Sequence, residues 1–276
     1  MVTQDITISV DGAAMAGYLA RPAEQSGPHP AVIVLGEVFG FTPEVRRITD
    51  LLESIGYVGL AIDYYHRINP RIAAPYTEEG SRQAFAAASN VKAEDLMRDV
   101  TAAIHWLNAQ PYVKAGKIAT WGFGFGGTAA LVTSSIQELS GAISFYPANI
   151  TAPMQPGSAA PIEYATRAAI PLLLVFGQED YYVSRFDMDR IREALRDASK
   201  DVRIQIYPNV GHSFFRHGRP EAVVETQRYS DESVAQAVAD AWDLVRVFLR
   251  DVFNRSPERA NASGDTHTPH TAPLQR

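Results

Sequence analysis

Hydrophobic residues form short uninterrupted runs along the chain, separated by stretches with the spacing of amphipathic helices. Residues 6–10 alternate apolar and polar side chains. After the turn at Asp11-Gly12 the strand pattern resumes at residues 15–19, which predicts a hairpin. Continuous apolar runs, typical of strands buried on both faces, occupy residues 31–36, 58–63, 117–121, 142–145, 172–176 and 202–206. Helical spacing is found at residues 43–55, 92–109, 128–132, 185–198 and 231–253.

This alternation of strands and helices predicts the fold class. We expect an α/β fold with a mostly parallel central sheet of about seven or eight strands, helices on both faces and the first hairpin antiparallel at one edge. Residues 1–254 are interpreted as one domain. Residues 149–169 are rich in Ala and Pro and interrupt the alternation, so we interpret them as a loop or lid-like excursion. Residues 255–276 lack periodicity, which predicts a disordered tail.

Composition narrows the function classes. A chain of 276 residues with 46% hydrophobic residues can build one large core, and its net charge of -6 gives no reason to expect nucleic acid or a membrane as partner. No run of 18 apolar residues is present, and the N-terminus lacks the features of a signal peptide. A cytoplasmic protein is the default expectation. The absence of cysteine excludes disulfides, thiolate zinc sites and a thiol nucleophile.

No metal or cofactor site is predicted from the residues. His267 and His270 lie in the tail, where solvated side chains are a better interpretation than metal ligands.

The most informative segment is Trp-Gly-Phe-Gly-Phe-Gly-Gly at residues 121–127. It lies between an apolar strand and a helix, the context in which α/β-hydrolases present a nucleophile in the pattern Gly-x-Ser/Cys-x-Gly. The flanking glycines suit a tight turn. The central position is Gly124, which has no oxygen or sulfur to attack a substrate.

Two further residues complete the order that this architecture uses, which is nucleophile, then acid, then histidine. Asp180 and His212 each follow an apolar strand, and the carboxyl ends of parallel strands meet at one edge of a sheet. Taken alone, Asp180 could cap the next helix and His212 could be a buried turn residue. In this order and spacing, the pair favours a catalytic acid and base.

These motifs resemble those of the dienelactone hydrolase family, a branch of the α/β-hydrolases that uses cysteine as nucleophile. The similarity covers roughly residues 5–253. It rests on Gly-Glu-Val-Phe-Gly at 36–40, Asp-Tyr-Tyr at 63–65, Gly-Phe-Gly-Phe-Gly-Gly at 122–127, Gly-Gln-Glu-Asp at 177–180 and Gly-His-Ser-Phe at 211–214. The resemblance implies an α/β-hydrolase fold, no cofactor and a small-molecule ester or lactone as substrate.

Roles for individual residues follow from the resemblance. In the family, the residue that matches Glu37 holds the thiol in its resting state and then exchanges partners as substrate enters. The positions that match Asp180 and His212 complete the triad. Backbone N–H groups at Val38 and Phe125 would form the oxyanion hole. Arg82 resembles the arginine that binds a substrate carboxylate, with a surface role as the alternative. The other expected substrate contacts are Phe39, Tyr64 and Ser213.

Glycine at 124 closes the covalent route, because no acyl-enzyme can form there. One hypothesis is a hydrolase in which His212, backed by Asp180, activates a water molecule, with turnover below that of a covalent enzyme. Glu37 could act as a second base or nucleophile, whereas Ser213 is a poor substitute because successive side chains diverge. The alternative is a non-catalytic small-molecule-binding protein. A third is an engineered substitution at position 124.

Overall fold

The computed structural model describes residues 1–23, 27–198, 201–217 and 231–255. Within these residues eight strands form one sheet in the order β1-β2-β4-β3-β5-β6-β7-β8. The hairpin of β1 (Val2–Val10) and β2 (Ala13–Arg21) lies at one edge, where β2 pairs antiparallel with β4. All later neighbours pair in parallel. The predicted mostly parallel sheet with an antiparallel hairpin at one edge is therefore confirmed.

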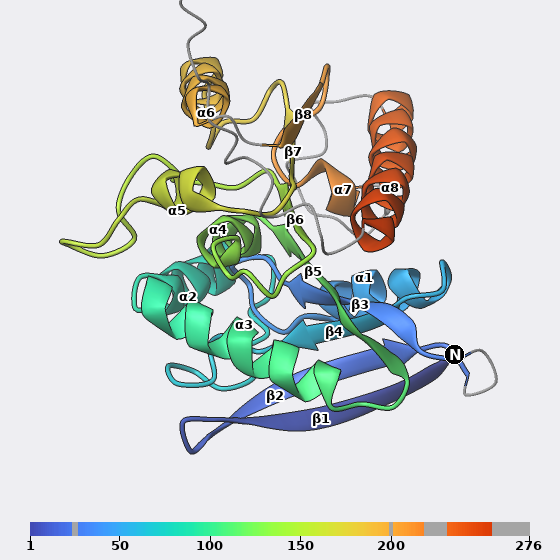
Figure 1. Cartoon of the computed structure of the whole chain (residues 1–276). Coiled ribbons are helices and arrows are strands. Elements are labelled where there is room, and N and C mark those ends of the chain that lie inside the picture. The colour runs from blue at the N-terminus through green and yellow to red at the C-terminus, as the bar shows by residue number, and fades with distance from the viewer. Residues whose placement is uncertain (24–26, 199–200, 218–230, 256–276) are drawn as a thin grey trace, which may run out of the picture.

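Helices cover both faces of the sheet (Figure 1). The parallel strands are β3 (His29–Leu35), β4 (Val58–Ile62), β5 (Val113–Phe123), β6 (Gly141–Phe145), β7 (Leu172–Gly177) and β8 (Val202–Tyr207). One face carries α2 (Glu78–Ala88), α3 (Ala93–Asn108), α4 (Phe125–Thr133), α5 (Pro161–Arg167) and α6 (Arg185–Asp197). The other carries α1 (Pro43–Glu53), the short α7 (Phe214–His217) and α8 (Asp231–Asn254).

The uninterrupted apolar runs are explained by a core on each face of the sheet. In β3, Ile33 and Leu35 point into the core beneath α3 and α4, whereas Val32 and Val34 point into the core beneath α1 and α8. All four side chains are buried. Since successive residues of a strand face opposite sides, a strand covered on both sides needs apolar side chains at every position.

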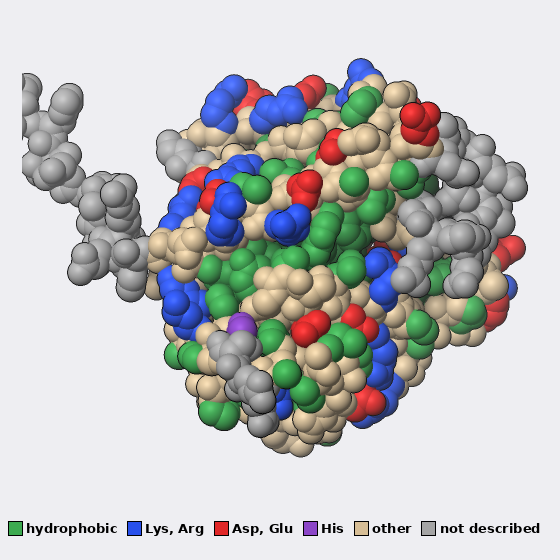
Figure 2. All heavy atoms as spheres, turned by 90° about the vertical axis from the view of Figure 1, so that its right-hand side faces the viewer, with side chains coloured by type: hydrophobic (Ala, Val, Ile, Leu, Met, Phe, Trp, Pro, Cys, Tyr) green, Lys and Arg blue, Asp and Glu red, His purple; other side chains and the backbone are tan. Residues whose placement is uncertain are grey.

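The outer surface on the side of α1 and α8 is mixed in character (Figure 2). Acidic and basic side chains are interspersed there, and apolar side chains gather near the middle of the face. Among the described residues, no helix has the length and apolar character needed to cross a membrane.

Three helices were not predicted from the sequence. Helix α2 begins after Thr77, whose side chain accepts a hydrogen bond from the N–H of Gly80, and α5 lies inside the excursion 149–169. Helix α7 has only four residues, too few for a periodic signal. The tail at 256–276, with His267 and His270, lies outside the described residues.

Candidate active site

The turn after β5 gives Gly124 a backbone conformation that side chains rarely adopt. Its φ is 55° and its ψ is -117°, in a sparsely populated region. The glycines two positions before and after it are required for a different reason. A Cβ on Gly122 would lie 1.9 Å from the carbonyl oxygen of Gly126, and one on Gly126 would lie 2.1 Å from that of Leu35. The backbone segments of the turn approach each other so closely that only glycine fits at these two positions.

Gly124 itself is not crowded. An ideal Cβ built on it would have His212 Nε2 at 3.7 Å and Glu37 Cγ at 3.8 Å as its nearest neighbours. Both distances are ordinary van der Waals contacts. The first atom of a side chain at this position would therefore lie in van der Waals contact with an imidazole nitrogen.

Asp180 and His212 form a buried pair at the carboxyl edge of the sheet. Asp180 follows β7 and His212 follows β8, and Nδ1 of the imidazole lies 2.9 Å from Oδ2 of the carboxylate. The Asp180 side chain is fully buried and that of His212 is 11% exposed. A carboxylate can only accept, so Nδ1 carries the hydrogen, and Nε2 is the ring nitrogen that lies on the side of Gly124.

Surrounding groups fix the orientation of this pair. Oδ1 of Asp180 accepts hydrogen bonds from the backbone N–H groups of Tyr182 at 2.8 Å and Val183 at 3.2 Å. The rings of Tyr146 and Tyr182 meet the imidazole edge-on, with centroids at 5.1 and 4.7 Å. The cap of α6 is Ser184 rather than Asp180, since the Ser184 hydroxyl accepts the first-turn hydrogen bond. Asp180 is therefore available to the histidine.

Glu37 has a partner that sequence reasoning missed. Its Oε2 accepts a hydrogen bond from Arg216 at 2.9 Å, and both side chains are largely buried. The Arg216 guanidinium also lies 4.4 Å from the ring centroid of Tyr76. Burial alone would lower the pKa of Arg216, but the combined interactions with Glu37, Tyr76 and Tyr146 outweigh this effect and raise the pKa. The guanidinium is therefore a permanent positive charge within the pocket.

The turn after β3 contains the expected oxyanion donor Val38. The N–H of Val38 makes no hydrogen bond to the described residues, and Phe125 supplies the first N–H of α4, which has no partner within the helix. Two tyrosines hold this turn from behind. Tyr64 donates to the carbonyls of Gly36 and Glu37 at 2.7 and 3.0 Å, and Tyr65 donates to that of Val38 at 3.0 Å.

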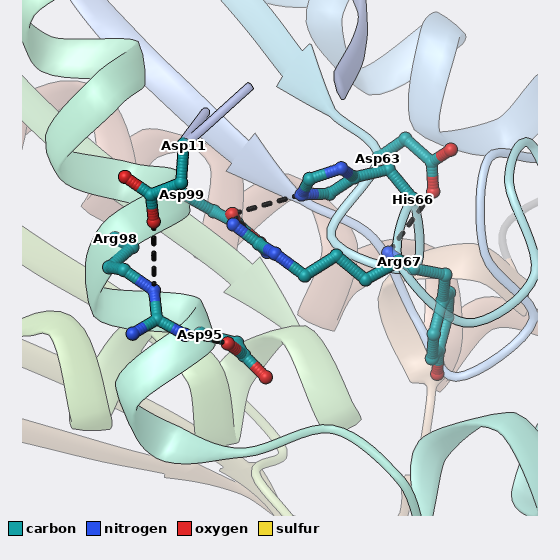
Figure 3. A network of polar contacts seen from close by, with 8 residues as sticks. Asp11, Asp63, His66, Arg67, Asp95, Arg98 and Asp99 are labelled. Atoms are coloured by element: carbon teal, nitrogen blue, oxygen red, sulfur yellow. Dashed lines mark hydrogen bonds and ion pairs between the residues drawn. The ribbon is translucent and has the colours of Figure 1, made fainter. Parts of the chain in front are cut away.

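A buried polar network anchors the segment that carries these tyrosines (Figure 3). Oδ1 of Asp99, on α3, lies 3.0 Å from His66 Nε2 and 2.6 Å from the Arg67 guanidinium. Asp63 accepts from the N–H groups of Tyr65 and Arg71 at 3.1 and 2.6 Å. Desolvation by burial raises the pKa of the Asp63 carboxyl. Because Tyr65 lies within this bonded segment, the network helps to position its hydroxyl against the turn after β3.

These groups open into a cavity of about 350 Å³. Its polar end contains Glu37, Gly124, His212 and Arg216. Its apolar wall comes from α2 and from the excursion 149–169, and consists of Phe85, Ala88, Ala152, Pro153 and Met154. A cavity of this size, apolar with a few convergent polar groups, is typical of a small-molecule site.

Not every residue expected at the site lines the cavity. Val38, Phe39, Phe125 and Ser213 do. Arg82 does not: its side chain is 69% exposed and pairs with Glu79 one helical turn away. The positions of α2 that do line the cavity are Ser81, Phe85 and Ala88, which are spaced along one helix face, and Arg82 is rotated away from that face. Tyr64 is also outside the lining, and its hydroxyl donates to backbone carbonyls of the turn after β3.

Comparison with known proteins agrees with this architecture. A protein from Synechocystis named "putative carboxymethylenebutenolidase" is 31% identical over 242 residues, which cover 87% of this chain and 93% of that protein. A Bradyrhizobium protein named "probable 2-oxo-3-(5-oxofuran-2-ylidene)propanoate lactonase" is 24% identical and covers 89% of this chain and 92% of its own length.

Among solved structures, a "putative dienelactone hydrolase" from Klebsiella pneumoniae superposes with a TM-score of 0.78 at 23% identity, covering 90% of this chain and 98% of that one. At this identity the likeness shows the shared fold, the α/β-hydrolase fold expected from the sequence. The model of the dienelactone hydrolase family matches residues 15–253. The chain therefore belongs to the dienelactone hydrolase family.

Proposed function

We propose that the protein hydrolyses small esters or lactones by a route in which water replaces the missing nucleophile. The observation that carries the proposal is the distance of 3.7 Å between His212 Nε2 and the place where a Cβ on Gly124 would stand. A water molecule in this space would lie beside an oriented base and open to the substrate cavity.

The reaction needs one proton carrier and one oxyanion site. His212 takes a proton from the water as its oxygen attacks the carbonyl carbon, and the negative charge that forms on the carbonyl oxygen is held by the N–H groups of Val38 and Phe125. The imidazolium, stabilised by Asp180, then gives its proton to the departing alkoxide. No covalent bond to the protein forms at any stage.

Turnover should be slower than in a covalent relative. In the serine-protease template, a site stripped of its nucleophile keeps roughly 10³–10⁴-fold catalysis over water through binding and the oxyanion hole. A positioned general base contributes about 10²–10⁴-fold in other enzymes. We expect measurable hydrolysis without a pre-steady-state burst.

The pocket and the relatives' names suggest the substrate class. The names carboxymethylenebutenolidase and lactonase describe enzymes that open unsaturated lactones. The Arg216 guanidinium would attract a substrate carboxylate, which would compete with Glu37 for it. The apolar wall that includes Phe85 and Met154 suits a short hydrocarbon or ring on the other side of the ester.

A second candidate is a binding protein that retains the pocket without chemistry. Its support is Gly124 itself, since glycine supplies no attacking atom. Against it stands the oriented Asp180–His212 pair, because binding alone requires no imidazole lone pair directed at the turn.

Steady-state assays on aryl esters and an unsaturated five-membered lactone separate the two functions. The parent should exceed the buffer rate, because a positioned base accelerates the attack of water. His212→Ala should remove the excess rate. His105→Ala is the matched control, because His105 is exposed on α3 and does not line the cavity. A parent that binds these compounds without hydrolysing them would instead be a binding protein.

A further inference from the structure

Exposed aromatic side chains are concentrated in the lining of the cavity. Among the described residues, the exposed aromatic side chains are Phe85, Tyr181, Tyr182 and Phe186, with exposed fractions of 50, 55, 43 and 70%. The first three line the cavity, and Phe186 does not. Single exposed apolar residues are ordinary, whereas several of them around one concave site mark a binding surface.

Two of these rings lie beside the imidazole of His212. Tyr181 and Tyr182 directly follow Asp180, and their ring centroids lie 6.0 and 4.7 Å from that of His212. The two tyrosine rings are themselves 4.2 Å apart. Tyr146 also contacts the imidazole, but it is buried and does not line the cavity. Within the described part of the chain, the aromatic neighbours of His212 that line the cavity are therefore Tyr181 and Tyr182.

The proposed reaction determines which part of a substrate reaches these rings. His212 Nε2 returns its proton to the leaving oxygen, which must come within a hydrogen-bond distance of about 2.6–3.2 Å. The group bonded to that oxygen is therefore held next to the imidazole, within reach of the two tyrosine rings. The acyl group is bonded to the carbonyl carbon and diverges from the leaving oxygen.

The chemistry of the tyrosine rings limits what that group can be. A phenol ring offers an uncharged apolar surface whose face is electron-rich and whose edge is electron-poor. A second aromatic ring packs offset or edge-on against such a surface and gains more than its buried area provides. A saturated ring of the same size gains only the burial. The surface beside His212 therefore discriminates aromatic rings from saturated ones.

We propose that Tyr181 and Tyr182 form a subsite for an aromatic ring on the alcohol side of the ester. The preferred substrates are then aryl and arylmethyl esters rather than esters of aliphatic alcohols. This inference rests on the proposed function, because His212 places the leaving oxygen, and it adds the chemical class of the alcohol part.

The test compares kcat/KM for benzyl butyrate and cyclohexylmethyl butyrate, with each value divided by the rate of hydroxide-catalysed hydrolysis of the same ester. The parent should prefer the benzyl ester by roughly 2–12-fold, the factor that one aromatic pair provides. Butyl phenylacetate and butyl cyclohexylacetate carry the same two rings on the acyl side and should differ less. Equal values for the two butyrates, or an equal aromatic preference on the acyl side, would overturn the inference.

Variants at position 181 test the ring directly. Tyr181→Leu keeps an apolar side chain but removes the ring, so the benzyl preference should fall towards one. Tyr181→Phe keeps the ring and should retain the preference. Phe186→Leu is the matched control, because Phe186 is 70% exposed and does not line the cavity. An unchanged benzyl preference in Tyr181→Leu would overturn the inference.

Binding of a compound that cannot be hydrolysed separates this inference from the proposed function. Phenethyl propyl ketone and cyclohexylethyl propyl ketone carry a methylene group in place of the ester oxygen. Calorimetry should show a lower Kd for the phenethyl ketone in the parent and not in Tyr181→Leu, even if the parent hydrolyses no ester. Equal Kd values for the two ketones in the parent would remove the subsite, while hydrolysis that depends on His212 would leave the hydrolase standing.

Discussion

Replacing Gly124 with cysteine should restore covalent chemistry and lower stability. The variant would carry a thiol beside His212 Nε2, 3.7 Å from the new Cβ, and near Glu37. A neighbouring imidazole promotes the thiolate, which is the reactive form. With a p-nitrophenyl ester as substrate, we expect a burst of p-nitrophenol equal to the enzyme concentration. We also expect inactivation by iodoacetamide. The parent has no cysteine and should show neither.

The stability change can be worked from the backbone. With φ at 55° and ψ at -117°, a residue with a Cβ pays about 1–3 kcal/mol of strain. The contacts at 3.7 and 3.8 Å add no clash. Each kcal/mol lost from the free energy of unfolding lowers the Tm by about 2–4 °C in a chain of 150–250 residues. A decrease of roughly 2–12 °C in Tm is therefore expected.

Two further glycine variants separate backbone strain from steric clash. Gly56→Ala places a Cβ at a positive φ of 83° with nothing within 4 Å, so it reports backbone strain alone. Gly122→Ala drives a Cβ to 1.9 Å from the carbonyl oxygen of Gly126 and should prevent normal folding. Circular dichroism measured during heating gives the Tm of each of the three variants. A Tm for Gly124→Cys above that of the parent would refute the strain argument, and a correctly folded variant without a burst would refute the proposed geometry of His212.

The remaining predictions concern charge and ionisation. Arg216→Gln should raise KM for an ester that carries a carboxylate by roughly 10–100-fold and leave neutral esters less affected, because a charged hydrogen bond contributes about 1.5–3 kcal/mol. Arg82→Gln, on the exposed side of α2, should change neither KM. Asp99→Asn should lower the free energy of unfolding in urea by about 3 kcal/mol, because it breaks a buried charge pair. Asp189→Asn, 73% exposed, is its control and should have little effect. Desolvation by burial raises the pKa of Tyr146 well above 10.0. As the pH rises, this tyrosine therefore loses its proton in the unfolded chain before it does so in the folded protein. The free energy of unfolding should fall by about 1.4 kcal/mol per pH unit above pH 10 for each such tyrosine. Absorbance of tyrosinate at alkaline pH should appear together with unfolding, and its full appearance in folded protein would contradict the burial argument.

The sheet could be predicted because burial on both faces leaves an unmistakable local pattern. Strand β3 needs apolar residues at every position from 31 to 35, so the sequence reports the strand directly. Asp180 and His212 could be found for the same reason, since each follows such a run and strand ends meet at one edge.

Contacts across long sequence separations could not be predicted. Arg216 meets Glu37 over 179 residues and lies on a helix of four residues, which has no periodicity to detect. One clue was available, because Arg216 follows His212 by only four residues. Arg82 was expected at the site from a loose motif, but the rotation of α2 directs Phe85 rather than Arg82 into the cavity.

In the proposed reaction the attacking atom does not belong to the protein. Mass spectrometry of the intact parent, quenched at intervals during a single turnover with enzyme in excess over a p-nitrophenyl ester, tests it most directly. We predict that product accumulates while the protein keeps its unmodified mass at every interval. A protein mass increased by one acyl group, forming and decaying at the rate of turnover, would contradict the account and would identify a residue such as Glu37 as a covalent nucleophile.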